Sequence, residues 1–315
     1  MSRRVVLIGV PTSAGAFAPG QEQAPAALRA AGLVEALAAA GIEVADDGDR
    51  ELWRWRPDRD QPRAQHAALV AAIARETAER VKRAGFVPHS DTNPAHPVTL
   101  VLGGDCTVGI GTVAGQLEGG GDVGLLYFDA HADLNVPDAV REGALDWMGM
   151  AHMLAEPGAR PELVWVGPRA PLLRDDQVLL FGWGPEQATD FERAAIERRG
   201  LERIEIDEVA ADPTGAAARA LASLEARCER LLVHFDVDVV DFTDAPLSEN
   251  TGRNEGLALA TALAALEVLL ASPKLAALTI TELNPAHTEA GGEAIERLVA
   301  AVAAGLATGR EEHAS

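Results

Sequence analysis

The sequence predicts an α/β protein in which one mainly parallel sheet is covered by helices on both faces. Short β-branched runs alternate along the chain with longer alanine-rich stretches, and this alternation is typical of doubly wound sheets with right-handed crossovers. The strand-like runs are almost continuously apolar, as expected when both faces of a strand are buried. A chain of 315 residues with 48% apolar composition is large enough to bury such a core.

The predicted strands are runs rich in valine, isoleucine and leucine. They are expected at residues 5–8, 98–102, 123–128, 163–166, 178–181, 231–235 and 275–281. The first run follows two arginines and ends before Pro11, so its apolar part is too short for a secretory signal. We therefore expect a strand at that position.

Alanine-rich stretches between these runs predict the helices that cover the sheet. They are expected near residues 24–40, 63–84, 190–199, 215–228, 259–271 and 293–307, and polar loops at 86–97, 136–145 and 243–255. The longest apolar stretch, residues 257–271, contains Glu267 and is followed by Pro273, so it cannot span a bilayer. Because the chain shows no internal repeat, we expect one domain over residues 1–315, with 309–315 as a disordered tail.

The chain is strongly acidic, with 27 lysines and arginines against 48 aspartates and glutamates and a formal net charge of −21. Such a charge repels phosphate backbones and anionic lipids, so we expect no nucleic-acid and no membrane partner, and we expect attraction of metals or cationic substrates. The two cysteines, Cys106 and Cys228, cannot form a disulfide framework in a chain of this length. We therefore expect a cytoplasmic protein, with Cys228 in the core.

Acidic and metal-competent side chains follow four of the predicted strands. They are GGDC at 103–106, DAHADLN at 129–135, DVDVVD at 236–241, and Glu282. Asp129, His131 and Asp133 alternate along the chain, so in extended backbone they point to one side. Asp236 and Asp238 do the same. Because ligands bind at the carboxyl ends of the strands in open α/β sheets, we expect these groups to converge at one site.

Convergence of so many carboxylates is electrostatically unfavourable unless a positive charge compensates it. None of the motifs contains a lysine or an arginine, so metal ions, and more than one, are the simplest neutralising groups. Carboxylate and imidazole ligands together suit Mn, Fe, Co or Zn, and two-metal sites suit hydrolysis. Helix capping explains the whole set poorly, although Asp105 taken alone fits a helix cap equally well.

Two other features allow more than one interpretation. His234 lies two residues before Asp236, and we favour a hydrogen-bonded core histidine over a group that supports the metal ligands. The segment GIGTVA, with Asp129 further on, fits the dinucleotide-binding pattern G-x-G-x-x-G/A with a later acidic residue. Its glycines, Gly109 and Gly111, come several residues after the strand end, and a dinucleotide site leaves the other acidic motifs unexplained. We therefore favour the metal site.

Taken together, the motifs resemble those of the ureohydrolase family, which includes arginases, agmatinases and formimidoylglutamases. The resemblance begins at IGVPTSAGAFAPGQEQAPAALRAAGL, continues through GGDC, YFDAHADLN and HFDVDVVD, and ends at ITELNPAH, so it covers most of the chain. It implies a three-layer α/β/α fold around an eight-stranded, mainly parallel sheet. It also implies a binuclear metal centre, most typically of Mn²⁺, that hydrolyses a C–N bond of a guanidino compound.

The resemblance also implies roles for individual residues. The metal ligands it implies are Asp129 and Asp236 as bridges, Cys106 and Asp133 at one metal, and His131 and Asp238 at the other. Glu282 matches the carboxylate that holds the guanidinium group. Asp133 matches the group that passes a proton to the leaving amine. Asn135 matches a residue that contacts the carboxylate end of the substrate in arginases.

Three departures from the family pattern leave the substrate open. Cys106 stands where most relatives have histidine, and a thiolate there adds negative charge and favours Zn, Fe or Co over Mn. Asp146 or Met148 occupies the place of a proton-shuttling histidine. Glu186 and Gln187 lie near the positions at which arginases carry acidic residues that recognise an α-amino group.

These observations predict a binuclear metal-dependent hydrolase acting on arginine, hydroxyarginine, agmatine or a similar small cationic guanidino substrate. The alternative is a non-catalytic or weakly active relative with an altered metal site, acting in binding or regulation. Because members of the family commonly assemble, we also expect a homo-oligomer, either a trimer or a hexamer.

Overall fold

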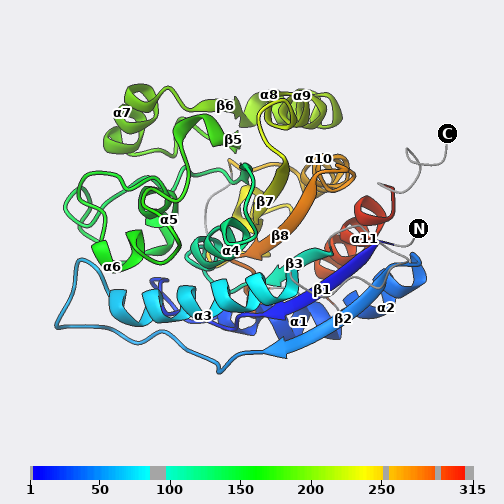
Figure 1. The fold of residues 1–315 in the computed structure, drawn as a ribbon, viewed down its shortest axis with the longest axis horizontal. Coiled ribbons are helices and arrows are strands. Elements are labelled where there is room, and N and C mark those ends of the chain that lie inside the picture. Colours follow the sequence, from blue (N-terminus) through cyan, green and yellow to red (C-terminus); the bar gives the residue numbers. More distant parts are fainter. Residues whose placement is uncertain (1–2, 86–96, 251–254, 288–291, 309–315) are drawn as a thin grey trace.

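An eight-stranded parallel sheet forms the centre of the protein (Figure 1). The structure, a computed structural model, describes residues 3–85, 97–250, 255–287 and 292–308. The strands are β1 (Arg4–Gly9), β2 (Glu43–Asp49), β3 (Val98–Leu102), β4 (Val123–Phe128), β5 (Val178–Trp183), β6 (Glu202–Glu205), β7 (Arg230–Asp236) and β8 (Leu275–Thr281). Their order is β2-β1-β3-β8-β7-β4-β5-β6, and every neighbouring pair is parallel, which confirms the expected sheet.

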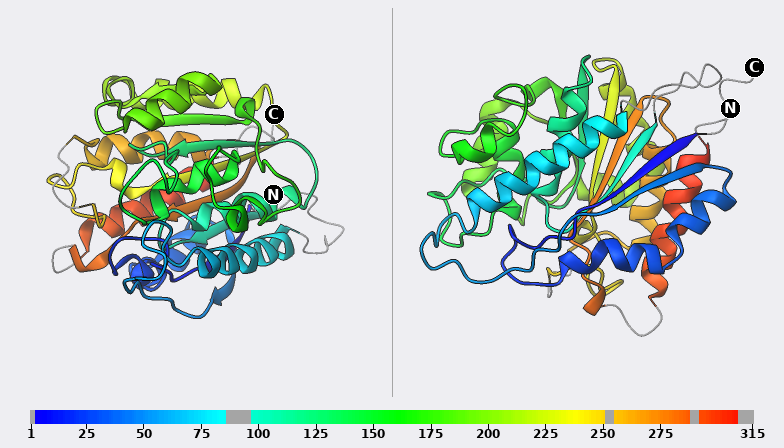
Figure 2. Two further views of the ribbon diagram at one scale, coloured as in Figure 1. Left: turned by 90° about the vertical axis from the view of Figure 1, so that its left-hand side faces the viewer. Right: turned by 60° about the horizontal axis from the view of Figure 1, so that its bottom comes forward.

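Helices cover both faces of this sheet, so the fold has three layers (Figure 2). One face packs against α1 (Ala24–Ala30), α2 (Leu33–Ala39), α8 (Ile206–Ala211), α9 (Pro213–Glu225), α10 (Leu259–Leu270) and α11 (Glu293–Thr308). The other packs against α3 (Ala67–Gly85), α4 (Val108–Leu117), α5 (Gly149–Met153), α6 (Pro161–Val164) and α7 (Asp190–Arg199). Successive strand residues alternate between the two cores: Leu126 and Phe128 enter the first, and Leu125 and Tyr127 the second.

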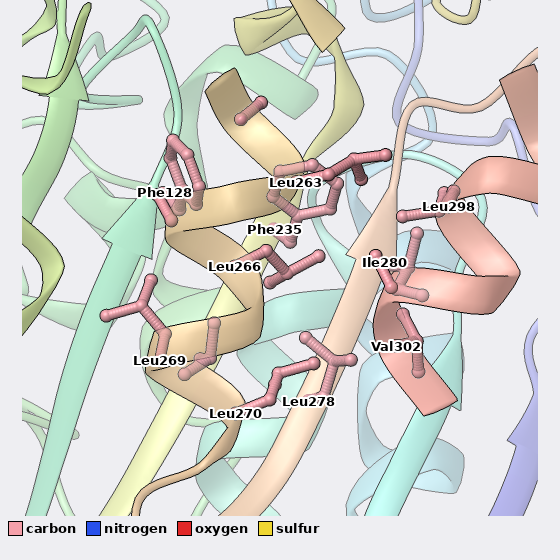
Figure 3. Close-up of a cluster of buried hydrophobic side chains, with 14 of the residues drawn as sticks. Phe128, Phe235, Leu263, Leu266, Leu269, Leu270, Leu278, Ile280, Leu298 and Val302 are labelled. Atoms are coloured by element: carbon pink, nitrogen blue, oxygen red, sulfur yellow. The ribbon is translucent and has the colours of Figure 1, made fainter. Parts of the chain in front are cut away.

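The first core includes the region where α10 and α11 lie against the middle of the sheet (Figure 3). Phe128 meets Phe181 edge to face, with ring centroids 4.8 Å apart, and Phe235 at 5.1 Å. Leu266 packs beside Phe235, and Leu278 lies further along, beside Leu270. Each such side chain contributes about 1.5–3 kcal/mol on burial, so this contact fixes the central strands whose ends carry the acidic motifs.

The sequence analysis missed the two edge strands, β2 and β6. Their sequences, EVADDGD and ERIE, contain no apolar run, because an edge strand is only half covered and its outer groups face solvent. Charged partners replace the missing burial at β2: Arg29 binds Asp46 and Asp49, and Arg80 binds Asp47. The interior strands, whose residues are buried on both faces, were all predicted.

Two predicted elements were wrong in kind or extent. Residues 163–166 form the end of α6 and the turn after it, not a strand, and Trp165 is 63% exposed there. The helix expected at 24–40 is two helices, because Gly32 takes a left-handed φ of 84° between them. The predicted tail at 309–315, nearly all of the loop at 86–97 and part of the loop at 243–255 lie outside the described residues.

The glycines of GIGTVA lie inside α4 rather than in a loop before it. A Cβ at Gly111 would come within 2.6 Å of the Ala74 carbonyl of α3, and one at Gly115 within 2.5 Å of the Ala78 carbonyl. These glycines therefore let α3 and α4 pack closely, and a dinucleotide-binding turn is excluded at this position.

Arg3 joins the ends of two helices to the first strand. Its guanidinium donates hydrogen bonds to the carbonyls of Leu270, Ser272 and Leu306, at the ends of α10 and α11. The carbonyls of Leu270 and Leu306 lie in the last turns of α10 and α11, where they have no partner within the helix, and Ser272 follows α10. An Arg3→Ala variant should therefore lose about 3 kcal/mol of unfolding free energy, measured by urea denaturation. Arg4→Ala is the matched control: Arg4 lies 3.5 Å from exposed Glu43, a pair worth at most about 1 kcal/mol. Equal losses in the two variants would contradict the capping role.

Candidate metal centre

Four neighbouring strands at the middle of the sheet deliver the acidic motifs to one edge. The strands β3, β8, β7 and β4 are adjacent, and one motif follows the carboxyl end of each. Phe128 pairs with Phe235, so Asp129 and Asp236 emerge side by side from β4 and β7. Asp236 in turn pairs with Thr281, which places Glu282 at the next strand end. The strand order thus explains why residues far apart in the sequence converge.

Cys106 lies at the centre of one half of the site. Its Sγ donates to Asp236 Oδ2 at 2.6 Å, and its backbone N–H donates to Glu282 Oε1 at 2.9 Å. The other oxygen of Glu282 accepts a hydrogen bond from Gln21 Nε2 at 3.0 Å. The N-terminal loop and the ends of three strands therefore hold this half of the site together.

His131 lies at the centre of the other half. Its Nδ1 is 3.3 Å from Asp129 Oδ1 and 3.2 Å from Asp238 Oδ2. The motifs here form tight turns, not the extended backbone that the sequence argument assumed. Asp129 Oδ1 accepts from the N–H of His131, and Asp236 Oδ1 from that of Asp238, each at 2.7 Å. These local bonds turn the chain at each strand end and aim the following side chains inward.

The potential ligand atoms form three groups, and the atoms within each group lie within 4.8 Å of one another. They are Cys106, Asp129 and Asp133; Asp129, His131 and Asp238; and Cys106, His234 and Asp236. Asp129 belongs to two of these groups, an arrangement that suits a carboxylate shared by two ions. All six ligands inferred from the resemblance therefore lie within this cluster.

Two of the candidate residues have strained backbones. Asp133 has a φ of 51° and Glu282 a φ of 63°, the left-handed region that non-glycine residues rarely adopt. Such conformations cost about 1–3 kcal/mol each and are concentrated at functional sites. Tyr127 donates a hydrogen bond to Asp133 Oδ2 and helps to hold that side chain in place.

A cavity of about 110 Å³ opens onto this cluster. Its lining comprises Phe17, Cys106, His131, Asp133, Glu142, Ala144, Asp146, Trp147, Asp236, Asp238, Asn250 and Glu282. Among these described residues there is no lysine and no arginine, whereas six are aspartate or glutamate. The cavity can therefore accept a small cation, and it opposes an anion.

Burial and mutual repulsion oppose ionisation of the clustered carboxyl groups. Burial, and then the charge of Asp238, raises the pKa of Asp129 to about 7. Burial also raises the pKa of Asp236 well above its usual value, with Asp238 as the next cause. The pKa of Glu282 is raised well above its usual value by burial and then by Asp146. Each of these groups therefore needs a neighbouring cation to be charged at neutral pH.

The thiol and the imidazole respond to the same charges. Burial and then Asp236 raise the pKa of the Cys106 thiol well above its usual value. Burial alone lowers the pKa of His131, but the carboxylates of Asp238 and Asp129 outweigh this effect and raise it well above 6.5. A divalent ion would reverse both shifts, because it stabilises thiolate and neutral imidazole as ligands.

The donor set fits divalent metal ions. It combines one sulfur, one imidazole and several carboxylates, and no described lysine or arginine lines the cavity to neutralise them. Asp129 Oδ2 is buried without a hydrogen-bond partner among the described residues, although a buried carboxylate oxygen normally has one. A metal ion would both compensate the charge of the carboxylates and bind the unpaired oxygen of Asp129.

In metal-free protein, we expect the unfolding free energy to fall as the pH rises from about 4 to about 7. Asp129 loses its proton near pH 3.8 in the unfolded chain but near pH 7 in the folded chain, so over this interval the folded chain binds more protons and loses stability with rising pH. The difference corresponds to about 4 kcal/mol. Urea unfolding after chelation measures it, and saturating Mn²⁺ or Zn²⁺ should flatten the profile. A metal-free profile that is already flat would contradict the expectation.

Other candidate residues lie around the cluster rather than in it. Asn135 is buried, its Oδ1 accepts from Thr189 Oγ1 at 2.8 Å, and it does not line the cavity. Asp105 accepts hydrogen bonds from the N–H groups of Gly15 and Thr107. The N-cap of α4 is Thr107, so Asp105 stabilises the turn before this helix and does not cap it. Cys228 is buried, as predicted. His152, the histidine that follows Asp146 and Met148 in the sequence, does not line the cavity, and its Nδ1 is 2.6 Å from the Met148 carbonyl.

Several residues at the site were not found from the sequence. Tyr127 and Gln21 contact Asp133 and Glu282, respectively, and Asn250 Nδ2 donates to Asp238 Oδ2 at 3.1 Å. Tyr127 and Gln21 lie in segments that carry the family resemblance, but nothing in those segments marked them as site residues. The one signal in the sequence was the position of Tyr127, two residues before Asp129, which in a strand places both side chains on the same side.

None of the described helices has the length and apolar character needed to cross a bilayer.

Residues 3–308 match the model of the arginase family. The chain is 26% identical to the arginase of Bacillus caldovelox over 89% of this chain and 91% of that protein, and 28% identical to human arginase-1 over 97% and 92%. Its fold is similar to that of an arginase from Bacillus subtilis, with a TM-score of 0.81 at 24% identity over 98% of this chain and 100% of the other. The chain belongs to the arginase family.

Proposed function

We propose that this arginase-family hydrolase cleaves a C–N bond of a small cationic guanidino compound, using two divalent metal ions. The observation that supports this most directly is the cavity of about 110 Å³, which is walled by carboxylates from neighbouring strand ends and lacks any described lysine or arginine. A guanidinium ion is planar, permanently charged and rich in N–H donors, so it matches such a cavity.

The metal ions would be held by the six clustered ligands. Asp129 is suited to bridge because its oxygens belong to two ligand groups, and Asp236 lies against Cys106 in the third. When bound, the metals supply a hydroxide nucleophile at neutral pH and an electrostatic partner for the developing charge. Mn²⁺ is expected from the family, while the sulfur of Cys106 makes Zn²⁺, Fe²⁺ or Co²⁺ suitable at its half of the centre.

Glu282 is positioned to bind and orient the guanidinium. Each of its oxygens accepts one hydrogen bond from the protein, from Cys106 N–H and from Gln21, and a carboxylate oxygen can accept another. Two parallel charge-assisted bonds to the substrate would fix the plane of the guanidinium over the metal ligands. The strained backbone of Glu282 is consistent with a side chain held in place before substrate binds.

Asp133 is suited to move the proton. Tyr127 donates to its Oδ2, which leaves Oδ1 for the metal or for the reacting proton. Burial, and then the charge of Asp129, raises the pKa of Asp133 well above its usual value, so it can hold a proton and return it to the leaving amine. Urea and an amine would be the products if the substrate is a simple guanidino compound.

The cavity wall favours a substrate without a nearby carboxylate. Glu142 and Asp146 line the cavity where an anionic end of the substrate would otherwise approach, and Asn135 does not reach it. Burial and then Asp105 raise the pKa of Asp146 to about 8, so an adjacent cation would favour the charged form of Asp146, whereas an adjacent anion would keep it neutral and gain no ion pair. The substrate's second functional group is therefore more favourable as an amine or hydroxyl than as an acid.

The proposal is tested by measuring urea release from arginine, hydroxyarginine, agmatine and guanidinobutyrate. Protein reconstituted with Mn²⁺, Zn²⁺, Fe²⁺ or Co²⁺ is compared with chelated protein. We expect metal-dependent release from at least one cationic substrate, and more from agmatine, which ends in an amine, than from guanidinobutyrate, which ends in a carboxylate. Absence of release from every substrate by protein shown to contain two metal equivalents would overturn the proposed activity and favour a binding role.

A further inference from the structure

A chain of polar contacts runs from Cys106 into the interior and is not used by the proposed reaction. Thr281 Oγ1 lies 3.3 Å from Cys106 Sγ and 3.1 Å from Nε2 of His234. All three residues are at most 2% exposed, so water cannot substitute for any of these contacts. The path connects the one sulfur in the ligand cluster to a buried imidazole on the adjacent strand.

The geometry fixes the direction of the hydrogen bonds along this path. His234 Nδ1 has no hydrogen-bond partner among the described residues, and it faces Gly109, where an added Cβ would lie only 2.7 Å away. A proton on Nδ1 would be a buried, unpaired donor pointing at backbone, so the proton belongs on Nε2. Nε2–H then donates to Thr281 Oγ1, and the hydroxyl hydrogen of Thr281 is free for the sulfur.

The imidazole is held firmly enough to impose this direction. It stacks on the ring of Tyr127, with centroids 4.3 Å apart and planes 11° from parallel. Gly109 of α4 leaves the space for its opposite edge. A second proton, on Nδ1, would find no acceptor among the described residues, so the ring carries one proton and that proton stays where the contacts place it.

We propose that His234 and Thr281 are positioning residues that keep a hydroxyl hydrogen directed at the Cys106 sulfur, so that Cys106 can act as a thiolate ligand. This inference rests on the proposed role of Cys106 at the metal centre. A thiolate surrounded by carboxylates is destabilised by repulsion, and one donated hydrogen bond offsets part of that cost. As a group that orients and tunes a ligand, the pair should affect metal affinity by about 10-fold to 100-fold.

The inference is tested in Co²⁺-loaded full-length protein through the sulfur-to-cobalt charge-transfer band and the Co²⁺ dissociation constant. Thr281→Val removes the hydroxyl at nearly constant volume, and Thr281→Ser keeps it. Without the donated hydrogen bond the sulfur electrons lie higher in energy, so Thr281→Val should move the band to longer wavelength and weaken Co²⁺ binding by about 10-fold. Thr281→Ser should restore both values, and a band that does not move in Thr281→Val would overturn the inference.

Two further variants separate a hydrogen-bond effect from general damage to the fold. Thr279 lies on the same strand and bonds Thr112 Oγ1 at 3.0 Å, away from the sulfur, so Thr279→Val should leave the band unchanged. His234→Phe keeps a ring beside Tyr127 but frees the Thr281 hydroxyl to rotate, so its band should shift in the same direction by a smaller amount. Equal shifts in Thr279→Val and Thr281→Val would contradict the inference. Absence of a sulfur-to-cobalt band in wild-type protein would instead refute Cys106 as a ligand.

Discussion

Replacement of Asp129 by asparagine should abolish metal-dependent activity while making the metal-free protein more stable. Asp129 lies in two of the three ligand groups, so its loss should weaken metal binding more than the loss of an outer positioning group, by over about 100-fold. Its pKa of about 7 shows that its charge is unfavourable in the folded chain without a cation. At pH 8 the neutral amide should therefore add about 4 kcal/mol to the unfolding free energy of chelated protein.

Asp105→Asn is the matched control for this prediction. Asp105 is as deeply buried, and burial also raises its pKa, but it belongs to none of the ligand groups. Calorimetric titration with Mn²⁺ and Zn²⁺ should show affinities within about 10-fold of wild type for Asp105→Asn and no tight site for Asp129→Asn. Retention of two tight metal sites in Asp129→Asn would show that the shared-ligand assignment is wrong.

Replacement of Glu282 by glutamine should lower kcat/KM by about 1,000-fold without destabilising the fold. The neutral side chain can keep its bond to the Cys106 N–H. Its new amino group can donate to Gln21 Oε1, which lacks a partner among the described residues, once the Gln21 amide turns over. The variant therefore loses mainly the negative charge that binds the guanidinium. Breaking the buried ion pair between Glu282 and the guanidinium costs about 4 kcal/mol.

Glu142→Gln provides the comparison, since it removes one carboxylate from the exposed wall of the same cavity. We expect less than about a 10-fold change in kcat/KM for it, because solvent screens a charge at that position. Steady-state assays with the best substrate from the urea-release screen, on both variants at equal metal content, make the comparison. Similar losses for the two variants would mean that Glu282 contributes only to the negative potential of the cavity and not through direct contact with the guanidinium.

The parts of the fold that the sequence predicted are those where one physical requirement dominates. The strands β3, β4 and β8 were predicted at their observed bounds, because residues buried on both faces leave a continuous apolar run. At residues 163–166 the run LVWV satisfied the same criterion, but there only Leu163 is buried and the segment closes a short helix. An apolar run of four residues does not distinguish a strand from a helix end.

The candidate site shows a similar division. Its ligands were identifiable because carboxylates at several strand ends have no other simple explanation. Gln21 was not, because its contact with Glu282 joins segments 261 positions apart in the chain. The left-handed backbone conformations of Asp133 and Glu282 could not be predicted either, since most aspartates and glutamates adopt a negative φ. His234 is buried and hydrogen-bonded to Thr281, as expected. Its proposed action on Cys106, however, is the supporting role that we disfavoured from the sequence.

The contact between Gly109 and the ring of His234 constrains how this sequence can change over evolutionary time. Any larger side chain at 109 would collide with an imidazole at 234, because a single added carbon already lies 2.7 Å from it. The two positions are therefore not independent: an ancestor could acquire histidine at 234 only after, or together with, glycine at 109. Reversal would have to follow the opposite order, so a descendant that still carries the histidine has no direct route to alanine in that helix.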